Sequence, residues 1–331
     1  MTGTRPAGLT ALQKEVLRIA LFALAVTLFL NSVSSGVALN FVMMALYAAL
    51  LAQAWNILGG YGGQFSFGHA LFFGTGAYVQ AITQLQAGLN PWLALPLSAL
   101  GGAVIGLLVG ALSFRYGLKG SYFALVTLAF AEVFRIVALS VPFTGAGVGL
   151  MVPLREGFAN MQFDSRRGYA LLILALVVLA LSVSCWLQHS RFGAYLQAVR
   201  DNEDAARASG VNPFRVKLGA IALSGAFMAA GGAFYVQVFQ YLDPGIAYGA
   251  QTSVEALVGA IVGGMGTLWG PVLGALALHA LADLTRNLFG QLPGINMVIY
   301  GSVLVLMIMF APRGLSGAGR SVRALWKGRP K

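Results

Sequence analysis

The sequence predicts an all-α fold: a polytopic integral membrane helical bundle of about ten transmembrane helices, with both termini in the cytoplasm. Hydrophobic residues make up 58% of the 331 residues and charged residues only 9%, whereas a soluble domain carries about a quarter charged residues. Long apolar runs recur through the whole chain, and a membrane β-barrel would instead show short segments of alternating polarity. The 43 glycines are typical of helices that pack closely in the lipid bilayer.

Ten candidate spans follow from the apolar runs and from the roughly 20 residues that a helix needs to cross a bilayer. Residues 1–18 form a segment before them, residues 19–311 form the transmembrane domain, and residues 312–331 form a basic tail. The stretch at 253–265 is short for a span, which predicts a broken or re-entrant helix. The candidate spans are residues 19–30, 39–58, 70–81, 92–114, 121–139, 169–187, 216–241, 253–265, 271–284 and 295–310.

The distribution of Lys and Arg predicts which segments face the cytoplasm. The net charge is 21 − 10 = +11, and the basic residues flank apolar runs, as the positive-inside rule describes. Residues 1–18, a polar loop at about 189–216 and the tail are all basic, so an even number of spans places all three in the cytoplasm. The connection at 141–168 then lies outside, although its three arginines oppose that placement. No folded polar domain presents this charge to nucleic acid, which is not an expected partner.

The polar loop carries signals for one short helix at residues 202–209. Asp201 is expected as its N-cap, and Asp204 places negative charge in its first turn. Gly210 suits the left-handed stop position, and Pro213 then prevents continuation of the helix.

A capped, charged helix between two membrane spans is a surface suited to contact with another protein. Its small residues Ala205, Ala206 and Ala208 would form a patch on it. We interpret the helix as the surface through which a cytoplasmic ATPase moves this membrane protein. The alternative is an ordinary solvated loop helix whose arginines only mark the cytoplasmic side.

Polar residues inside apolar runs are candidates for a solute path, because each is expensive in lipid and must face protein or water. Glycine-rich interruptions at 59–62 and 263–266 echo each other, and paired breaks mark the pathway in many transporters, although glycine pairs are also common at this composition. Structural hydrogen bonds are an equal alternative for the polar residues around the first interruption. For Glu132 the alternative is neutralisation by Arg135, and for Glu255 a charge at a helix N-terminus. The candidates are Asn56, Gln64, Ser66, His69, Glu132 and Glu255.

Signals for catalysis are missing from the sequence. The three histidines lack the spacing and the Cys or carboxylate partners of a metal site. Neither a Gly-x-x-x-x-Gly-Lys-Ser/Thr phosphate loop nor a Gly-x-Ser-x-Gly elbow occurs. The single cysteine, Cys185, lies in an apolar run and is expected to be buried. We therefore expect no catalytic residue, no metal site and no cofactor bound by this chain, which we do not expect to be an enzyme.

Four stretches carry a family resemblance. Residues 56–69 read Asn-Ile-Leu-Gly-Gly-Tyr-Gly-Gly-Gln-Phe-Ser-Phe-Gly-His and are followed by Phe-Phe-Gly-Thr-Gly-Ala-Tyr at 72–78. Residues 263–275 read Gly-Gly-Met-Gly-Thr-Leu-Trp-Gly-Pro-Val-Leu-Gly-Ala. Together with the loop at 191–210 and Pro-Arg-Gly-Leu at 312–315, these stretches resemble the permease subunits of branched-chain amino-acid ABC importers. The resemblance is to the M-type subunit of this high-affinity hydrophobic amino-acid uptake family.

The resemblance implies a multi-pass subunit of the bacterial cytoplasmic (inner) membrane and a set of partners. These are a sister permease in a heterodimer, two cytoplasmic ATPases that bind ATP and Mg²⁺, and an extracytoplasmic solute-binding protein. Branched-chain amino acids are the implied substrates, with other amino acids, urea, short amides or organic acids as alternatives. The connection at 141–168 is expected to help receive the binding protein.

The resemblance also assigns the polar loop as a coupling helix. ATP binding would close the ATPases, push the helix around Ala205 and Ala206, and open the pathway on the other side. Ala206→Glu is then expected to abolish coupled uptake without preventing assembly. The competing function is a stand-alone secondary transporter or channel for a small polar solute, which would not depend on this helix. The residues expected in ATPase coupling are Arg200, Asp201, Asn202, Glu203, Ala205, Ala206 and Gly210.

Overall fold

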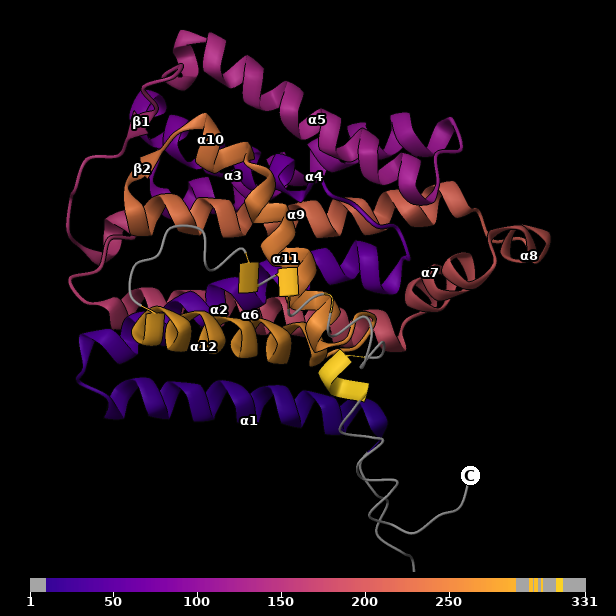
Figure 1. The fold of residues 1–331 in the computed structure, drawn as a ribbon, viewed down its shortest axis with the longest axis horizontal. Coiled ribbons are helices and arrows are strands. Elements are labelled where there is room, and N and C mark those ends of the chain that lie inside the picture. Colours follow the sequence, from indigo (N-terminus) through magenta and orange to yellow (C-terminus); the bar gives the residue numbers. More distant parts are fainter. Residues whose placement is uncertain (1–9, 290–297, 300, 303–304, 306–313, 318–331) are drawn as a thin grey trace, which may run out of the picture.

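The computed structural model describes residues 10–289, 298–299, 301–302, 305 and 314–317. Within these residues the chain is built almost wholly of helices, most of which run along one common direction (Figure 1). The expected polytopic helical membrane protein is confirmed. The helices are α1 (Ala11–Ser32), α2 (Gly36–Asn56), α3 (His69–Ala87), α4 (Pro91–Arg115), α5 (Gly120–Ser140), α6 (Arg166–His189), α7 (Arg191–Asp201), α8 (Glu203–Ala208), α9 (Pro213–Phe239), α10 (Pro244–Tyr248), α11 (Ala250–Gly263) and α12 (Gly270–Phe289), and the strands are β1 (Leu150–Met151) and β2 (Tyr241–Leu242).

Seven helical segments of the described residues are long and apolar enough to cross a membrane. Helices α3 and α12 run beside them in the bundle (Figure 1). The expected span at 295–310 falls largely outside the described residues. The seven segments are Ala11–Ser32, Gly36–Tyr61, Pro91–Arg115, Gly120–Ser140, Arg166–His189, Pro213–Phe239 and Pro244–Gly263.

The short stretch expected at 253–265 belongs to the second, longer part of a broken span, α11. The first part of the span is α10, which begins at Pro244 and is capped by Asp243. The Oδ1 atom of Asp243 accepts hydrogen bonds from the backbone N–H groups of Gly245 at 2.7 Å and Ile246 at 3.0 Å. Such a cap starts a helix even where only a few residues follow. The break lies at Gly249, between α10 and α11, so the broken-helix alternative is confirmed.

Small residues let three backbones approach closely where α9 packs between α3 and α4. Gly102 of α4 faces Gly225 of α9, and a Cβ atom at Gly225 would lie only 2.6 Å from the carbonyl oxygen of Gly102. Gly76 of α3 meets the backbone of Ala229 in the same way. Lipid tails are as apolar as leucine, so close backbone packing of this kind is what holds membrane helices together.

The two ends of the bundle differ. Helices α7 and α8 project at one end, and the connection between α5 and α6 lies at the other (Figure 1). This outer connection, residues 141–165, is tied to the end of α9 because β1 and β2 pair in antiparallel fashion, with Leu150 opposite Leu242.

The start of α1 lies at the α7–α8 end. A groove there is lined by Leu12 and Val16 of α1 and by His189 and Ser190, which join α6 to α7. The described residues 314–317 lie near this end as well, because Gly314 contacts the backbone of Gly263 and Gly264 at the end of α11.

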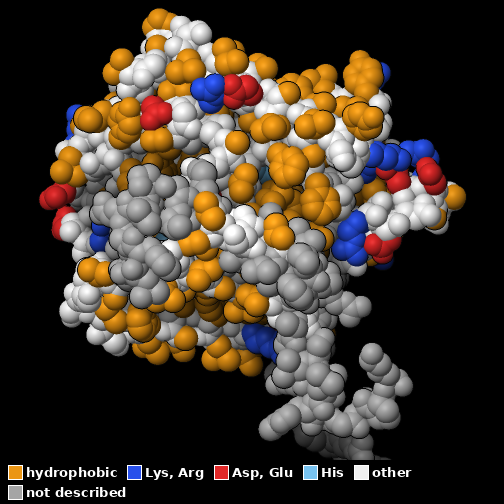
Figure 2. Space-filling view, viewed as in Figure 1, with side chains coloured by type: hydrophobic (Ala, Val, Ile, Leu, Met, Phe, Trp, Pro, Cys, Tyr) orange, Lys and Arg blue, Asp and Glu red, His pale blue; other side chains and the backbone are white. Residues whose placement is uncertain are grey.

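The surface has the polarity of a membrane protein. Hydrophobic side chains cover much of the face in Figure 2, whereas Lys, Arg, Asp and Glu gather over α7 and α8. Large side chains are openly exposed along the long helices: Leu24 of α1 is 55% exposed, Leu100 of α4 61% and Leu125 of α5 60%. Exposure of this extent along several long helices marks a surface that meets lipid or another protein rather than water.

Candidate functional site

The projecting segment at the α7–α8 end contains two helices where the sequence predicted one. Asp201 is the last residue of α7, so the expectation that Asp201 caps the coupling helix is wrong. Asn202 is the cap: its Oδ1 atom accepts from the backbone N–H groups of Asp204 at 3.1 Å and Ala205 at 3.0 Å. The physical reason is that Asn202 has extended backbone angles, φ −157° and ψ 107°, and separates the two helices. Gly210 has φ +85°, the left-handed conformation that was expected there.

The small residues of α8 do not share one surface. Ala206 is only 5% exposed and packs into the hydrophobic core of the chain. Ala205 and Ala208 are exposed. The expected patch is therefore divided, because residues one position apart on a helix face different sides. Ala206 attaches α8 to the bundle, and Ala205 and Ala208 are the members of the set that another protein could touch.

Glu203 anchors α8 to the membrane-spanning helices. Its carboxylate lies 2.7 Å from the Nζ atom of Lys217 on α9 and 3.1 Å from that of Lys119, which precedes α5. Lys217 is 3% exposed, and its ammonium group also lies 5.5 Å from the centre of the Phe114 ring on α4. Burial raises the pKa of the Glu203 carboxyl, but the hydrogen bonds from Lys217 and Lys119 outweigh it and hold the pKa below its ordinary value.

Arg200 at the end of α7 reaches into the bundle. Its Nη1 atom donates to the carbonyl oxygen of Gly60 at 3.2 Å, and its Nε atom donates to Asp201 at 3.0 Å. Gly60 belongs to a π-helical turn, Ile57–Tyr61, that ends α2. Carbonyls at an irregular helix end lack a regular partner and need one from elsewhere. The guanidinium of Arg200 supplies it from the projecting segment.

The two glycine-rich interruptions meet at this point. The amide of Asn56 bridges them: its Oδ1 atom accepts from the N–H of Gly266 at 2.7 Å, and its Nδ2 atom donates to the carbonyl of Thr267 at 3.1 Å. A Cβ atom at Gly266 would lie 3.2 Å from the carbonyl oxygen of Gly60 and 3.3 Å from Nη1 of Arg200. We call this set the glycine junction: Asn56, Gly60, Arg200, Gly266 and Thr267.

Ser66 and His69 form a separate buried hydrogen-bond chain. The Nδ1 atom of His69 lies 3.1 Å from Oγ of Ser66, and its Nε2 atom lies 2.9 Å from Oγ of Ser224 on α9. Ser224 donates to the carbonyl of Ala54 at 2.7 Å, so its oxygen accepts the Nε2–H of a neutral imidazole. Both ring nitrogens of His69 thus have hydrogen-bond partners inside the protein. This arrangement matches the alternative in which these polar residues form structural hydrogen bonds.

The remaining path candidates lie apart from one another. Gln64 follows the π-helical turn and donates to the carbonyl of Gly62 at 3.2 Å. Glu132 is exposed on the outer face of α5 and is paired with Arg135, with contacts of 2.5 and 2.9 Å. Glu255 on α11 accepts from Gln251 at 2.9 Å. The structure brings only Asn56 of the six candidates into the glycine junction.

The sequence indicated Lys119 and Lys217 only as markers of the cytoplasmic side, and their pairing with Glu203 was missed. A signal for Lys217 was present, because a lysine within an apolar helix must have a partner to be tolerated there. Among the described residues no group of three or more His, Cys, Asp or Glu could hold a metal ion.

A family profile described as "branched-chain amino acid transport system / permease component" matches residues 37–310, which is most of the chain. The chain belongs to this permease family. The permease is 31% identical over 313 residues to the high-affinity branched-chain amino acid transport system permease protein LivM of Salmonella typhimurium, covering 87% of this chain and 72% of the relative. It is also 31% identical over 333 residues to LivM of Escherichia coli, covering 93% and 76%. A probable LivH permease of Methanocaldococcus jannaschii is 27% identical over 267 residues, covering 73% and 79%.

These relatives confirm the resemblance on which the coupling hypothesis rests. The permease is a multi-pass protein of the bacterial inner membrane and a membrane-spanning subunit of an ABC importer. Its relatives are transport subunits rather than enzymes.

Proposed function

We propose that the permease carries branched-chain amino acids or related small solutes inward and is moved by two cytoplasmic ATPases that dock on α7 and α8. The observation that carries the proposal is the pair of links from this segment into the bundle. Arg200 connects α7 to the glycine junction, and Glu203 connects α8 to α9. A force on the α7–α8 segment would therefore reach both the glycine junction and α9. Coupling between two sites requires such physical links.

The proposed assembly uses both ends of the bundle. A sister permease completes a heterodimer, the ATPases bind ATP and Mg²⁺ at the α7–α8 end, and an extracytoplasmic solute-binding protein docks at the outer connection. This permease binds no cofactor itself. We further propose ten spans with both termini in the cytoplasm. The start of α1 and residues 314–317 both lie near the α7–α8 end, which supports an even number of spans.

The outer face of α5 is proposed to meet the sister permease or a solute path between the two chains. Glu132 and Arg135 are charged, lie in the second half of a 21-residue span, and project from the bundle. Charged side chains in a membrane face protein or water rather than lipid, because lipid cannot solvate them. The other path candidates, Asn56, Gln64, Ser66, His69 and Glu255, then contribute from within this chain.

The partners can be tested by purifying the tagged permease in mild detergent and identifying what accompanies it by mass spectrometry. Recovery of a second permease and of ATPase subunits is the expected result. Purification of the permease alone, together with active transport after it is reconstituted by itself, would establish a stand-alone transporter instead.

The docking surface can be tested by site-directed crosslinking. Replacing Cys185, the only cysteine of the chain, by alanine gives a background without thiols. We expect Ala205→Cys to crosslink to an ATPase, and Ala206→Cys, which is buried against the same chain, not to do so. Equal crosslinking of the two variants, or of neither, would contradict the proposed surface.

A further inference from the structure

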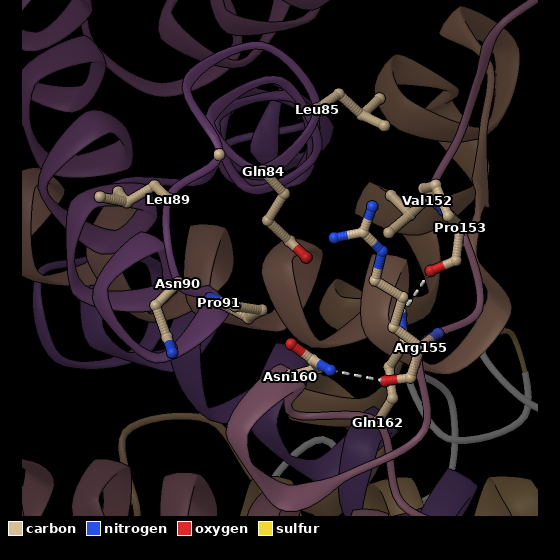
Figure 3. Close-up of a pocket in the computed structure, with 11 residues that line it drawn as sticks. Gln84, Leu85, Leu89, Asn90, Pro91, Val152, Pro153, Arg155, Asn160 and Gln162 are labelled. Carbon is tan, nitrogen blue, oxygen red and sulfur yellow. Dashed lines mark hydrogen bonds between the residues drawn. The ribbon is translucent and has the colours of Figure 1, made fainter.

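A polar pocket lies at the end of the bundle opposite α7 and α8. It has a volume of about 280 Å³ and lies between the end of α3, the start of α4 and the outer connection (Figure 3). Gln84 and Leu85 of α3 line one side, and Val152 and Arg155 of the outer connection line the other. No residue of the glycine junction or of the α7–α8 segment lines it, so it belongs to neither of the sites described above.

The wall that carries Arg155 is fixed in place. Gln162 is 2% exposed, and its Oε1 atom accepts from the backbone N–H of Arg155 at 2.5 Å. The Nδ2 atom of Asn160 donates to the carbonyl of Arg155 at 3.0 Å. Asn90, at the start of α4, donates to the carbonyl of Ala159 at 3.1 Å and joins this wall to the opposite one. Arg155 therefore presents its side chain from a backbone that is held on both sides.

The guanidinium of Arg155 is available for a ligand. It forms none of the ion pairs found among the described residues. In Figure 3 the side chains of Arg155 and Gln84 extend toward each other across the pocket. The Nε2 atom of Gln84 donates to the carbonyl of Gln80 at 2.9 Å, which leaves its Oε1 atom as an acceptor. Leu85, Leu89 and Val152 add apolar surface beside these polar groups.

We propose that this pocket binds a carboxylate, with the guanidinium of Arg155 as its partner. The planar fork of an arginine matches the two oxygens of a carboxylate and holds them by parallel, charge-assisted hydrogen bonds. A small apolar α-amino acid fits the rest of the lining, because Gln84 can accept from its ammonium group and the apolar residues can contact its side chain. This identification of the ligand rests on the proposed function, and the carboxylate of an acidic side chain on the binding protein has the same chemistry.

The test is binding of three probes to the purified permease by calorimetry. L-leucine carries both charged groups, L-leucinamide lacks the carboxylate, and 4-methylpentanoate lacks the ammonium group. We expect Arg155→Gln to weaken L-leucine and 4-methylpentanoate binding by about tenfold or more, the usual effect of losing a charge-assisted hydrogen bond. L-leucinamide should bind weakly to both proteins. Arg166→Gln, which removes an exposed arginine that does not line the pocket, is the matched control and should change nothing.

A second arm distinguishes the two sources of the carboxylate. If L-leucine does not bind the permease, but Arg155→Gln weakens capture of the binding protein about tenfold and Arg166→Gln does not, the carboxylate belongs to the partner. If Arg155→Gln changes neither binding of the probes nor capture of the binding protein, the proposal is overturned. Failure of leucine uptake by the wild-type importer, with Arg155-dependent binding intact, would contradict the proposed substrate and leave the pocket as a carboxylate site.

Discussion

Glu203 and Lys217 hold α8 against the bundle at a place where neither charge is well exposed to water. The side chain of Lys217 is 4% exposed and that of Glu203 is 16% exposed. A buried charge is tolerated only because its partner is present, so removal of Glu203 leaves Lys217 unpaired. The pair therefore acts as a structural joint between the projecting segment and α9.

The first prediction is that Glu203→Gln loosens this joint. The amide cannot neutralise Lys217, and we expect a loss of about 1–3 kcal/mol of stability, typical of a buried polar group left without its partner. Thermal unfolding of the purified permease in detergent measures this loss. Asp204→Asn is the matched control, because the Asp204 side chain is 84% exposed, and it should leave the melting temperature almost unchanged. Equal effects of the two substitutions would contradict a specific role for Glu203.

The second prediction concerns pH. The pKa of the Glu203 carboxyl is lower in the folded protein than its ordinary value of 4.5, so its ion pairs stabilise the fold fully above pH 4.5. That contribution is lost as the pH falls through the folded-state pKa, where the carboxylate takes up a proton. The difference in melting temperature between wild type and Glu203→Gln should thus be constant from pH 8 to pH 5 and shrink below about pH 4.5. A difference that persists at the lowest pH would show that the carboxylate charge is not its cause.

Helix α8 has an inner side and an outer side, and two adjoining alanines face opposite sides. Ala206 packs into the core and Ala205 is exposed, while the cap at Asn202 fixes the rotation of the helix. With six residues, α8 cannot be stable by itself, so packing against the bundle determines its position. A substitution on the inner side changes that packing, whereas one on the outer side changes only what the helix offers to a partner.

The third prediction uses this difference. Ala206→Glu would bury an unpaired carboxylate, and we expect it to lower the melting temperature of the permease alone. Ala205→Glu should leave the melting temperature unchanged but abolish ATP-driven uptake in the assembled importer, because it alters the docking surface. Thermal unfolding and uptake into proteoliposomes separate the two effects. Normal uptake by the Ala205→Glu variant would remove Ala205 from the docking surface.

At the scale of the whole molecule, local signals predicted the elements, and contacts between distant residues decided how they act together. The short length of the stretch at 253–265 predicted a broken span, which the structure breaks at Gly249. Backbone preference predicted the left-handed Gly210. The hydrogen bond from Gly266 to Asn56 joins residues 210 positions apart, and no local pattern shows that the two interruptions touch. Helix α7 was missed because its mixed composition reads as a polar loop, and this omission misplaced the cap at Asp201.

The last prediction is the orientation of the whole bundle in the membrane. The basic residues over α7 and α8 indicate the cytoplasmic side, and the outer connection, with Val148 83% exposed, then faces outward. On a Cys185→Ala background, we expect Val148→Cys to react with a membrane-impermeant maleimide added to intact spheroplasts, and Ser209→Cys to react only after the membrane is opened. The two positions are matched, because both are exposed. Val148 lies in the outer connection just before β1, and Ser209 directly follows α8 at the other end. Labelling of Ser209→Cys in intact spheroplasts would invert the orientation, and with it the proposed sides for the ATPases and for the carboxylate pocket.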